Sequence, residues 1–266
     1  MIKFFRHIRR NLMETGKTGK YFKYAIGEIV LVVIGILIAL QINNWNEDRK
    51  ERVEEQTILK QLQTEFKSNL KQLDDKIAIR SGIIYSATQL VYAIDHPEER
   101  VKDSIDKYIA TTIGYTTFDP IVSDHSNSSS LKLIQNDSLK QLLSFWTSEV
   151  IQVTEVEETW YHYRNDIYLP FLIKNYQLRT ARNGLIKNNY LKQFQIDKNT
   201  DSNLLKSGGV GNTKHKEDFN ALLEIPDYED HLIRCIITNN IAEVQAITLR
   251  KRIVSILEII DSEIKN

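Results

Sequence analysis

An unbroken apolar run near the N-terminus constrains this chain more than any other feature. The eighteen residues from Ala25 to Ile42 carry a single charge, that of Glu28. As a helix they would extend about 27 Å, close to the ~30 Å hydrocarbon thickness of a bilayer. Aromatic residues lie at both ends of the run, as is typical of the membrane–water interface: Tyr21, Phe22 and Tyr24 before it, and Trp45 after it. The sequence therefore predicts a transmembrane helix at residues 24–45.

A cleaved signal peptide is the main alternative to a permanent anchor. Its apolar region would be about 7 to 15 residues long and would end at a small-x-small cleavage site. Residues 39–43, Ala-Leu-Gln-Ile-Asn, offer no such site. We therefore expect the helix to be retained as an uncleaved anchor.

Charge is distributed unevenly on the two sides of this run. Residues 1–23 hold seven basic side chains and one acidic side chain, whereas residues 43–266 hold 28 basic and 33 acidic ones. The positive-inside rule then predicts that residues 1–23, a basic tail that could be amphipathic, lie in the cytoplasm. Residues 46–266 would lie in the periplasm. The expected location is the inner membrane, with a single pass.

Small residues and one carboxylate in the run suggest contact with a second transmembrane helix. Gly27, Gly35 and Ala39 share a face, and Gly35-xxx-Ala39 is a small-xxx-small pair that lets helix backbones approach closely. Glu28 lies near the predicted cytoplasmic end. Its carboxylate either snorkels to the interface or makes a polar contact with a partner helix, and the sequence leaves both open.

Three segments together resemble a known family. They are the block from Tyr24 to Glu47, YAIGEIVLVVIGILIALQINNWNE, the basic start Phe4-Phe-Arg-His-Ile-Arg9, and the later segment Ser130-Leu-Lys-Leu-Ile-Gln-Asn-Asp-Ser-Leu139. The chain is similar here to a family of single-span membrane proteins from Bacteroidota that has no assigned function. It differs where that family has Ser-Gly-Asn, since Ser128-Ser-Ser130 stands there instead. The resemblance implies topology and an envelope location, and it carries over no catalytic residue.

After the apolar run the hydrophobic pattern is helical almost throughout, and ten Gly and four Pro are few for 266 residues. The pattern predicts an all-α fold. A long helix should cover residues 46–94, starting with a charged stalk at 46–55, and a second should begin at 95–99 and carry Val101, Ile105, Tyr108 and Thr112 inward. A third, capped by Asn136 or Asp137, should continue to Phe171 with a kink at Pro170. Residues 114–130 and 197–216 are expected to form mobile loops.

The last helix has the most regular pattern in the chain. Apolar and small residues recur at alternating steps of four and three, which is the seam of a coiled coil: Tyr228, Leu232, Cys235, Asn239, Ala242, Ala246, Leu249, Ile253, Ile256 and Ile260. The seam predicts coiled-coil-like packing in a helical bundle, within one chain or between chains. Asn239 is then expected to set register or pairing, and Cys235 to fill a core position.

No pattern in the sequence indicates catalysis, a metal site or a bound cofactor, so we expect a protein without enzymatic activity, cofactor or nucleic-acid partner. The partners that the sequence suggests are the lipid bilayer and either a second copy or another envelope protein. Two functions follow. One is a membrane-anchored interaction or scaffold module. The other is a ligand-sensing bundle that signals through a partner, for which an aromatic cluster on the third helix, including Trp160, Tyr163 and Tyr168, could supply a pocket.

Overall fold

The computed structural model describes residue 10 and residues 18–122, 128–187, 210–211, 213–215 and 218–264. Within these ranges every regular element is a helix, which confirms the predicted all-α class. The chain divides into two compact units, Met1–Thr57 and Ile58–Asn266.

A single helix, α2, contains both the apolar run and the helix that was expected to follow it. It extends from Thr18 to Asp95, over 78 residues. No Pro interrupts these residues, and the helix ends just before His96-Pro97, where Pro disfavours helical geometry in the preceding residue. The charged stretch after the apolar run is stabilised locally by an ion pair between Arg52 and Glu55 at 3.0 Å.

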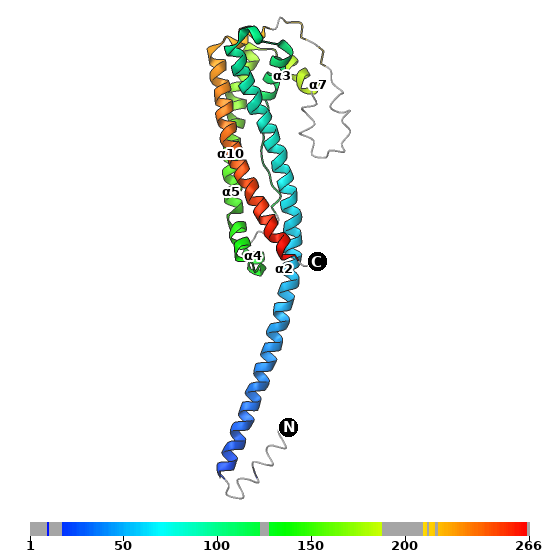
Figure 1. Cartoon of the computed structure of the whole chain (residues 1–266), viewed down its shortest axis with the longest axis vertical. Coiled ribbons are helices and arrows are strands. Elements are labelled where there is room, and N and C mark those ends of the chain that lie inside the picture. Colours follow the sequence, from blue (N-terminus) through cyan, green and yellow to red (C-terminus); the bar gives the residue numbers. More distant parts are fainter. Residues whose placement is uncertain are drawn as a thin grey trace. The chain divides into compact units, whose positions relative to one another are not determined.

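The second unit is built on three long helices that lie side by side: residues 58–95 of α2, α5 (Asp137–Tyr163) and α10 (Pro226–Glu263) (Figure 1). Helix α5 runs in the same direction as α2, because Phe66 packs on Trp146, with ring centroids 4.8 Å apart, and Arg80 pairs with Glu157 further along both helices. The connection between two parallel helices must therefore return along the bundle.

Helix α10 runs opposite to α2 and α5. Arg250 of α10 pairs with Asp74 of α2 at 2.6 Å, whereas Glu243, earlier in α10, pairs with Arg80, later in α2. All ten residues of the predicted seam of α10 are buried, with at most 2% of any of them exposed. The seam therefore faces the core of its own bundle.

The predicted start of α5 is confirmed. Asn136 is the N-cap residue, and its side-chain oxygen accepts a hydrogen bond from the Leu139 backbone N–H at 3.0 Å. This bond satisfies one of the four backbone donors that a helix leaves free at its N-terminus.

The second helix begins later than expected. Pro97–Glu99 form a 3₁₀ turn, η1, and α3 extends from Lys102 to Thr112 after an extended residue, Val101. The prediction that Val101 faces inward is wrong, since 59% of it is exposed, whereas Ile105 and Thr112 are buried as predicted. Helices α7 (Leu178–Lys187) and α9 (Phe219–Leu223) pack with α3 at this end of the bundle.

The segment predicted as a loop at 114–130 has two parts in the structure. Residues 114–122 are irregular, but Thr116 and Phe118 within them are buried. Residues 128–133 form a short helix, α4 (Ser128–Leu133), which corrects the expectation of a loop there. Most of the second predicted loop, 197–216, lies outside the described residues.

A π-helical turn shifts the face that the end of α5 presents to the core. The turn, η3, covers Arg164–Tyr168 and is followed by α6 (Leu169–Asn175), in which Pro170 occupies an N-terminal position. The apolar stripe of α5 through Trp146, Val153 and Trp160 predicts Ile167 inside, but Ile167 is 48% exposed and Tyr168 is buried in its place. A π turn contains one residue more than an α turn, so every later side chain moves to a new face.

Candidate functional site

The most exposed apolar surface of the first unit is the predicted span. One helix in the described part of the chain, beginning near the N-terminus, is long and apolar enough to cross a membrane. Every large apolar side chain from Ile29 to Ile42 is at least 45% exposed, and Trp45 is 65% exposed. Soluble surfaces rarely show an apolar patch of this size, so a bilayer or a partner helix is the expected environment of these residues.

The small residues of the span leave space beside the helix. A Cβ atom added to Gly27 or Gly35 would meet no heavy atom within 4 Å, and Ala39 is exposed. Glu28 is half-buried. The face that these residues share is thus open to the close approach of another helix.

A buried polar network lies in the middle of the bundle, and its arginine was not anticipated. Arg80 is completely buried and is paired with the carboxylate of Glu157 on α5. Its guanidinium also donates to the Thr116 hydroxyl at 3.0 Å and to the Ala242 backbone carbonyl at 3.2 Å. The network joins α2, α5, α10 and the 114–122 segment, and its charges are compensated from within the chain.

Glu157 binds two groups: the Arg80 guanidinium and the irregular segment 114–122. Its second carboxylate oxygen accepts the Phe118 backbone N–H at 2.5 Å, and its first accepts the Thr116 hydroxyl at 3.1 Å. Both oxygens of this fully buried carboxylate thus accept bonds from donors of the same chain. This cluster is a structural junction between elements.

The predicted aromatic cluster lies at the end of the bundle near η3, where it packs as core. Trp160 Nε1 donates to the Gly114 carbonyl at 2.9 Å, and the hydroxyls of Tyr168 and Thr112 are 2.7 Å apart. The sequence did not assign Tyr228 and His231 of α10 to this cluster. Tyr168 and Tyr228 stack with centroids 6.5 Å apart, and burial raises the pKa of both phenols.

His231 lies at the edge of the aromatic cluster. Its Nδ1 is 2.8 Å from the Tyr163 hydroxyl, and the Phe171 ring centroid is 4.5 Å from that of the imidazole. Burial lowers the pKa of His231, and the carboxylates of Asp227 and Asp230 partly oppose this shift. In the described part of the chain, no group of three or more His, Cys, Asp and Glu side chains is placed to hold a metal ion.

The predicted seam polar residue, Asn239, is 2% exposed and donates from its side-chain amide to the Cys235 backbone carbonyl one turn earlier, at 2.9 Å. Cys235 is buried beside it, and burial raises the pKa of its thiol. Both side chains are enclosed by their own bundle.

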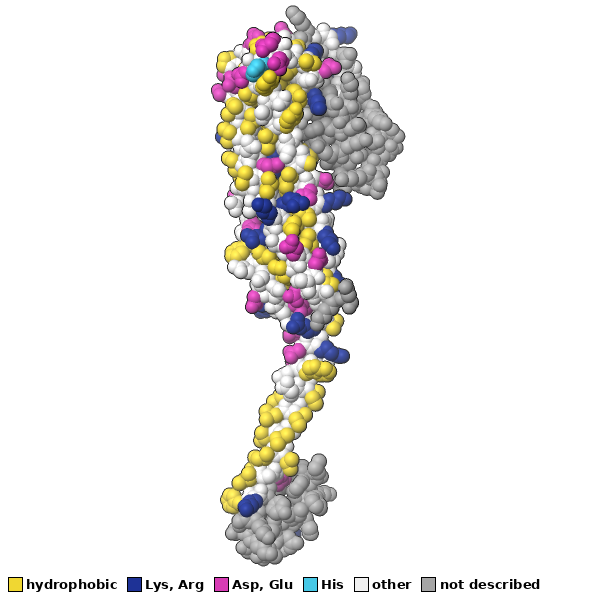
Figure 2. Space-filling view, viewed as in Figure 1, with side chains coloured by type: hydrophobic (Ala, Val, Ile, Leu, Met, Phe, Trp, Pro, Cys, Tyr) yellow, Lys and Arg dark blue, Asp and Glu magenta, His cyan; other side chains and the backbone are white. Residues whose placement is uncertain are grey.

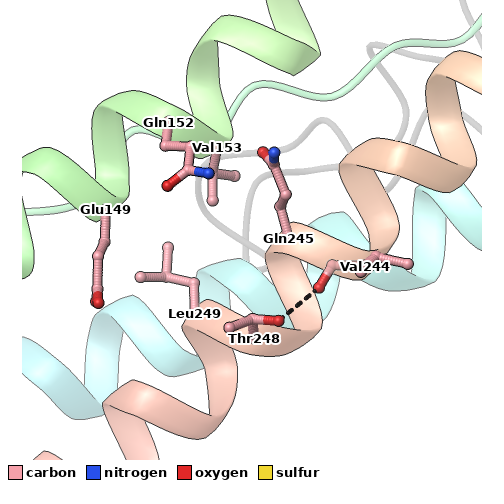
Figure 3. A pocket seen from close by; sticks show the side chains of 7 residues that line it. All are labelled: Glu149, Gln152, Val153, Val244, Gln245, Thr248 and Leu249. Carbon is pink, nitrogen blue, oxygen red and sulfur yellow. Dashed lines mark hydrogen bonds between the residues drawn. The ribbon is translucent and has the colours of Figure 1, made fainter.

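A small groove lies between α5 and α10 (Figure 3), with a volume of about 180 Å³. Its walls combine polar and apolar side chains: Glu149, Gln152, Val153, Val244, Gln245, Thr248 and Leu249. Pockets for small ligands are typically about 300 to 1,000 Å³, so this groove suits part of a side chain better than a metabolite.

The outer face of α10, which points away from its seam, is also apolar. Five large apolar side chains on it are between 39% and 66% exposed: Ile233, Ile237, Ile241, Val244 and Ile247. Hydrophobic side chains gather over the part of the bundle where α10 lies (Figure 2). Val244 belongs both to this face and to the groove, so the two form one continuous surface.

Residues 28–169 match the model of a family of unknown function, DUF6090. The match covers more than half of the 266 residues. The chain belongs to this family. A search of curated proteins gave no match, and a search of solved structures gave none either.

The DUF6090 match begins at Glu28 within the apolar run and ends at Leu169, directly after the π turn. It therefore includes the Arg80–Glu157 junction and the 114–122 segment held by it. Helix α10, with its apolar outer face, lies after the matched region.

Proposed function

We propose that this DUF6090 member is a membrane-anchored interaction module. The apolar run of α2 crosses the inner membrane once with the N-terminus in the cytoplasm. The bundle lies in the periplasm, where it binds a second copy or another envelope protein. No cofactor and no nucleic acid take part in this function.

One observation carries the proposal: the same helix, α2, contains an exposed apolar run and, from Ile58 onward, the first helix of a bundle with a complete core. Among the described residues of its unit, none of the most apolar 18-residue window of the run is buried. The basic bias of residues 1–23 supports the orientation. The exposed apolar face of α10 supports a protein partner rather than a small ligand.

Membrane fractionation tests the anchor. The full chain should stay with the membrane pellet after washes with high salt and with alkaline carbonate, whereas a chain carrying Ile34→Lys and Leu37→Lys should be found in the wash. A matched control, Ile237→Lys on the exposed face of α10, should stay in the pellet. Release of the unaltered chain by either wash would contradict an integral anchor.

The face of Gly27, Gly35 and Ala39 is the proposed contact between spans. Replacing Gly35 and Ala39 by Ile should reduce cross-linking of the full chain in membranes, because the larger side chains separate the two backbones. Val33→Ile with Leu37→Ile, on the opposite face, is the matched control. Cross-linking that is unaffected by the first pair of changes would exclude this contact.

A further inference from the structure

The outer face of α10 carries a second seam. Ile233, Ile237, Asn240, Val244 and Ile247 follow one another at steps of four, three, four and three, the same alternation as the buried seam. All five are exposed. The 4-3 alternation is the pattern of a helix that packs along another helix, and here no helix among the described residues covers it.

We propose that this second seam pairs with the same seam of a second copy of the chain, with the two α10 helices parallel. The inference rests on the proposed function, because it identifies the partner that the anchored bundle binds. Both copies would enter one membrane through the same N-terminal helix, and this shared anchorage raises the local concentration of each seam near the other.

The residues of the seam suit a copy of themselves. A two-fold interface brings the same patch of both chains together, so a self-complementary surface is required. Apolar side chains then meet apolar side chains at four of the five positions. At the central position, which is position d of the heptad, Asn240 meets Asn240 of the other copy, and two amides can hydrogen-bond each other.

Charges beside the seam add to this complementarity. In the heptad defined by the seam, Glu229 occupies position g and Arg234 the following position e, which lie opposite each other across a parallel pair. Both side chains are exposed, and the Arg234 guanidinium lies over the Tyr163 ring, 5.5 Å from its centroid. Two Glu229–Arg234 pairs would therefore flank one end of the interface.

The seam is short and is bounded by charge. Asp230 precedes it and Lys251 follows it at the next heptad positions, where like charges would meet in a parallel pair and oppose its extension beyond residues 233–247. An antiparallel pair would instead place Asp230 opposite Lys251, and Ile233 opposite Ile247. The two arrangements can therefore be distinguished by which positions meet.

Cysteine cross-linking of the full chain in membranes tests the proposal. In a Cys235→Ser background, Ile233→Cys and Ile247→Cys should each give a disulfide-linked dimer on oxidation with copper phenanthroline. Glu155→Cys, exposed on α5, is the control and should not. Adding Val244→Glu to the Ile233→Cys chain should lower the dimer to the control level, while leaving thermal unfolding unchanged because 66% of Val244 is exposed.

Two results would overturn the proposal. Cross-links that form only between Ile233→Cys and Ile247→Cys chains produced together would show an antiparallel pair. The absence of cross-links at both positions, with the chain in the membrane pellet, would exclude this face as the interface and leave the anchored module intact. A chain missing from the pellet would instead contradict the proposed function, so the two failures are distinguishable in the same samples.

Discussion

Asn69 and Ile121 exchange two hydrogen bonds. The Asn69 amide nitrogen donates to the Ile121 carbonyl at 2.9 Å, and the Ile121 backbone N–H donates to the Asn69 amide oxygen at 2.8 Å. Gln72, one turn further along α2, makes the same pair of bonds with Asp119, at 2.8 and 3.2 Å. Asn69 and Gln72 thus hydrogen-bond to the backbone of the irregular segment 114–122. These bonds hold the return connection of the bundle along α2.

Removing one of these side chains should destabilise the fold. Asn69 is 1% exposed, so Asn69→Ala removes two hydrogen bonds to the Ile121 backbone from a buried position. We expect a loss of about 1 to 3 kcal/mol in the free energy of unfolding, measured by denaturant titration in detergent. Lys71→Ala, exposed on the same helix, should change it by less than about 0.5 kcal/mol. Equal effects of the two changes would mean that the segment is not held by these bonds.

In the buried Arg80–Glu157 ion pair, the stability cost of removing one charge should depend on whether the other charge is still present. Glu157→Leu leaves the buried Arg80 guanidinium without its carboxylate, and we expect a loss of about 3 to 5 kcal/mol. Arg80→Met combined with Glu157→Leu should recover part of this loss, because no charge then remains buried. The exposed neighbour Glu158 provides the control, Glu158→Leu. The two residues would not depend on each other if the double variant lost as much free energy of unfolding as Arg80→Met and Glu157→Leu lose together as single variants.

These two junctions also show where sequence reasoning is limited. The apolar residues of α2 predict a stripe of eight inward-facing residues: Leu59, Leu62, Phe66, Leu70, Leu73, Ile77, Ile84 and Val91. The structure buries Leu59, Leu62, Phe66 and Leu73 as predicted, whereas Leu70, Ile77, Ile84 and Val91 are only half-buried. Beyond Leu73 the buried face continues through Arg80 and Ala87. This continuation was not predicted because it contains a charge, and a buried charge is expected only when its partners are known. Those partners lie on other helices, so the sequence of α2 alone does not reveal them.

The end of α5 shows a second limit of periodicity. Up to Trp160 the predicted stripe buries Leu139, Trp146, Val153 and Trp160, whereas Leu142 and Val150 are only half-buried. One extra residue in the π turn then moves Ile167 out and Tyr168 in. Pro170 indicates an irregularity in the helix, because it lacks the backbone N–H that a regular helix uses. It does not specify whether that irregularity is a kink or a π turn. The seam of α10 has no such interruption, and all of its predicted residues are buried.

Acid should destabilise the end of the bundle that contains His231. Burial lowers the pKa of His231 below its ordinary value of about 6.5, so the unfolded chain binds a proton that the folded chain does not. The stabilisation is present above the unfolded pKa and is lost as the pH falls through it, from about pH 7 to pH 5. Melting temperatures across this range should fall more steeply for the unaltered chain than for His231→Gln. His162→Gln, at an exposed position, should keep the steep dependence, and parallel curves for all three would contradict the assignment.

The thiol of Cys235 should be unreactive in the folded chain. It is completely buried and burial raises its pKa, so little thiolate is present or accessible at about pH 7.5. A maleimide reagent should label it only after denaturation. Glu155→Cys in a Cys235→Ser background should be labelled in the native chain, because Glu155 is exposed on α5. Rapid labelling of Cys235 in the native chain would mean that the seam of α10 opens readily.

The orientation of the chain is the most direct test of a membrane-anchored bundle. In a Cys235→Ser background, Arg10→Cys lies before the span and Glu155→Cys lies in the bundle, and both residues are exposed. Spheroplasts are treated with a maleimide that does not cross membranes, before and after lysis. The account predicts that position 155 is labelled in intact spheroplasts and position 10 only after lysis. Labelling of position 10 in intact spheroplasts, with position 155 protected until lysis, would contradict it.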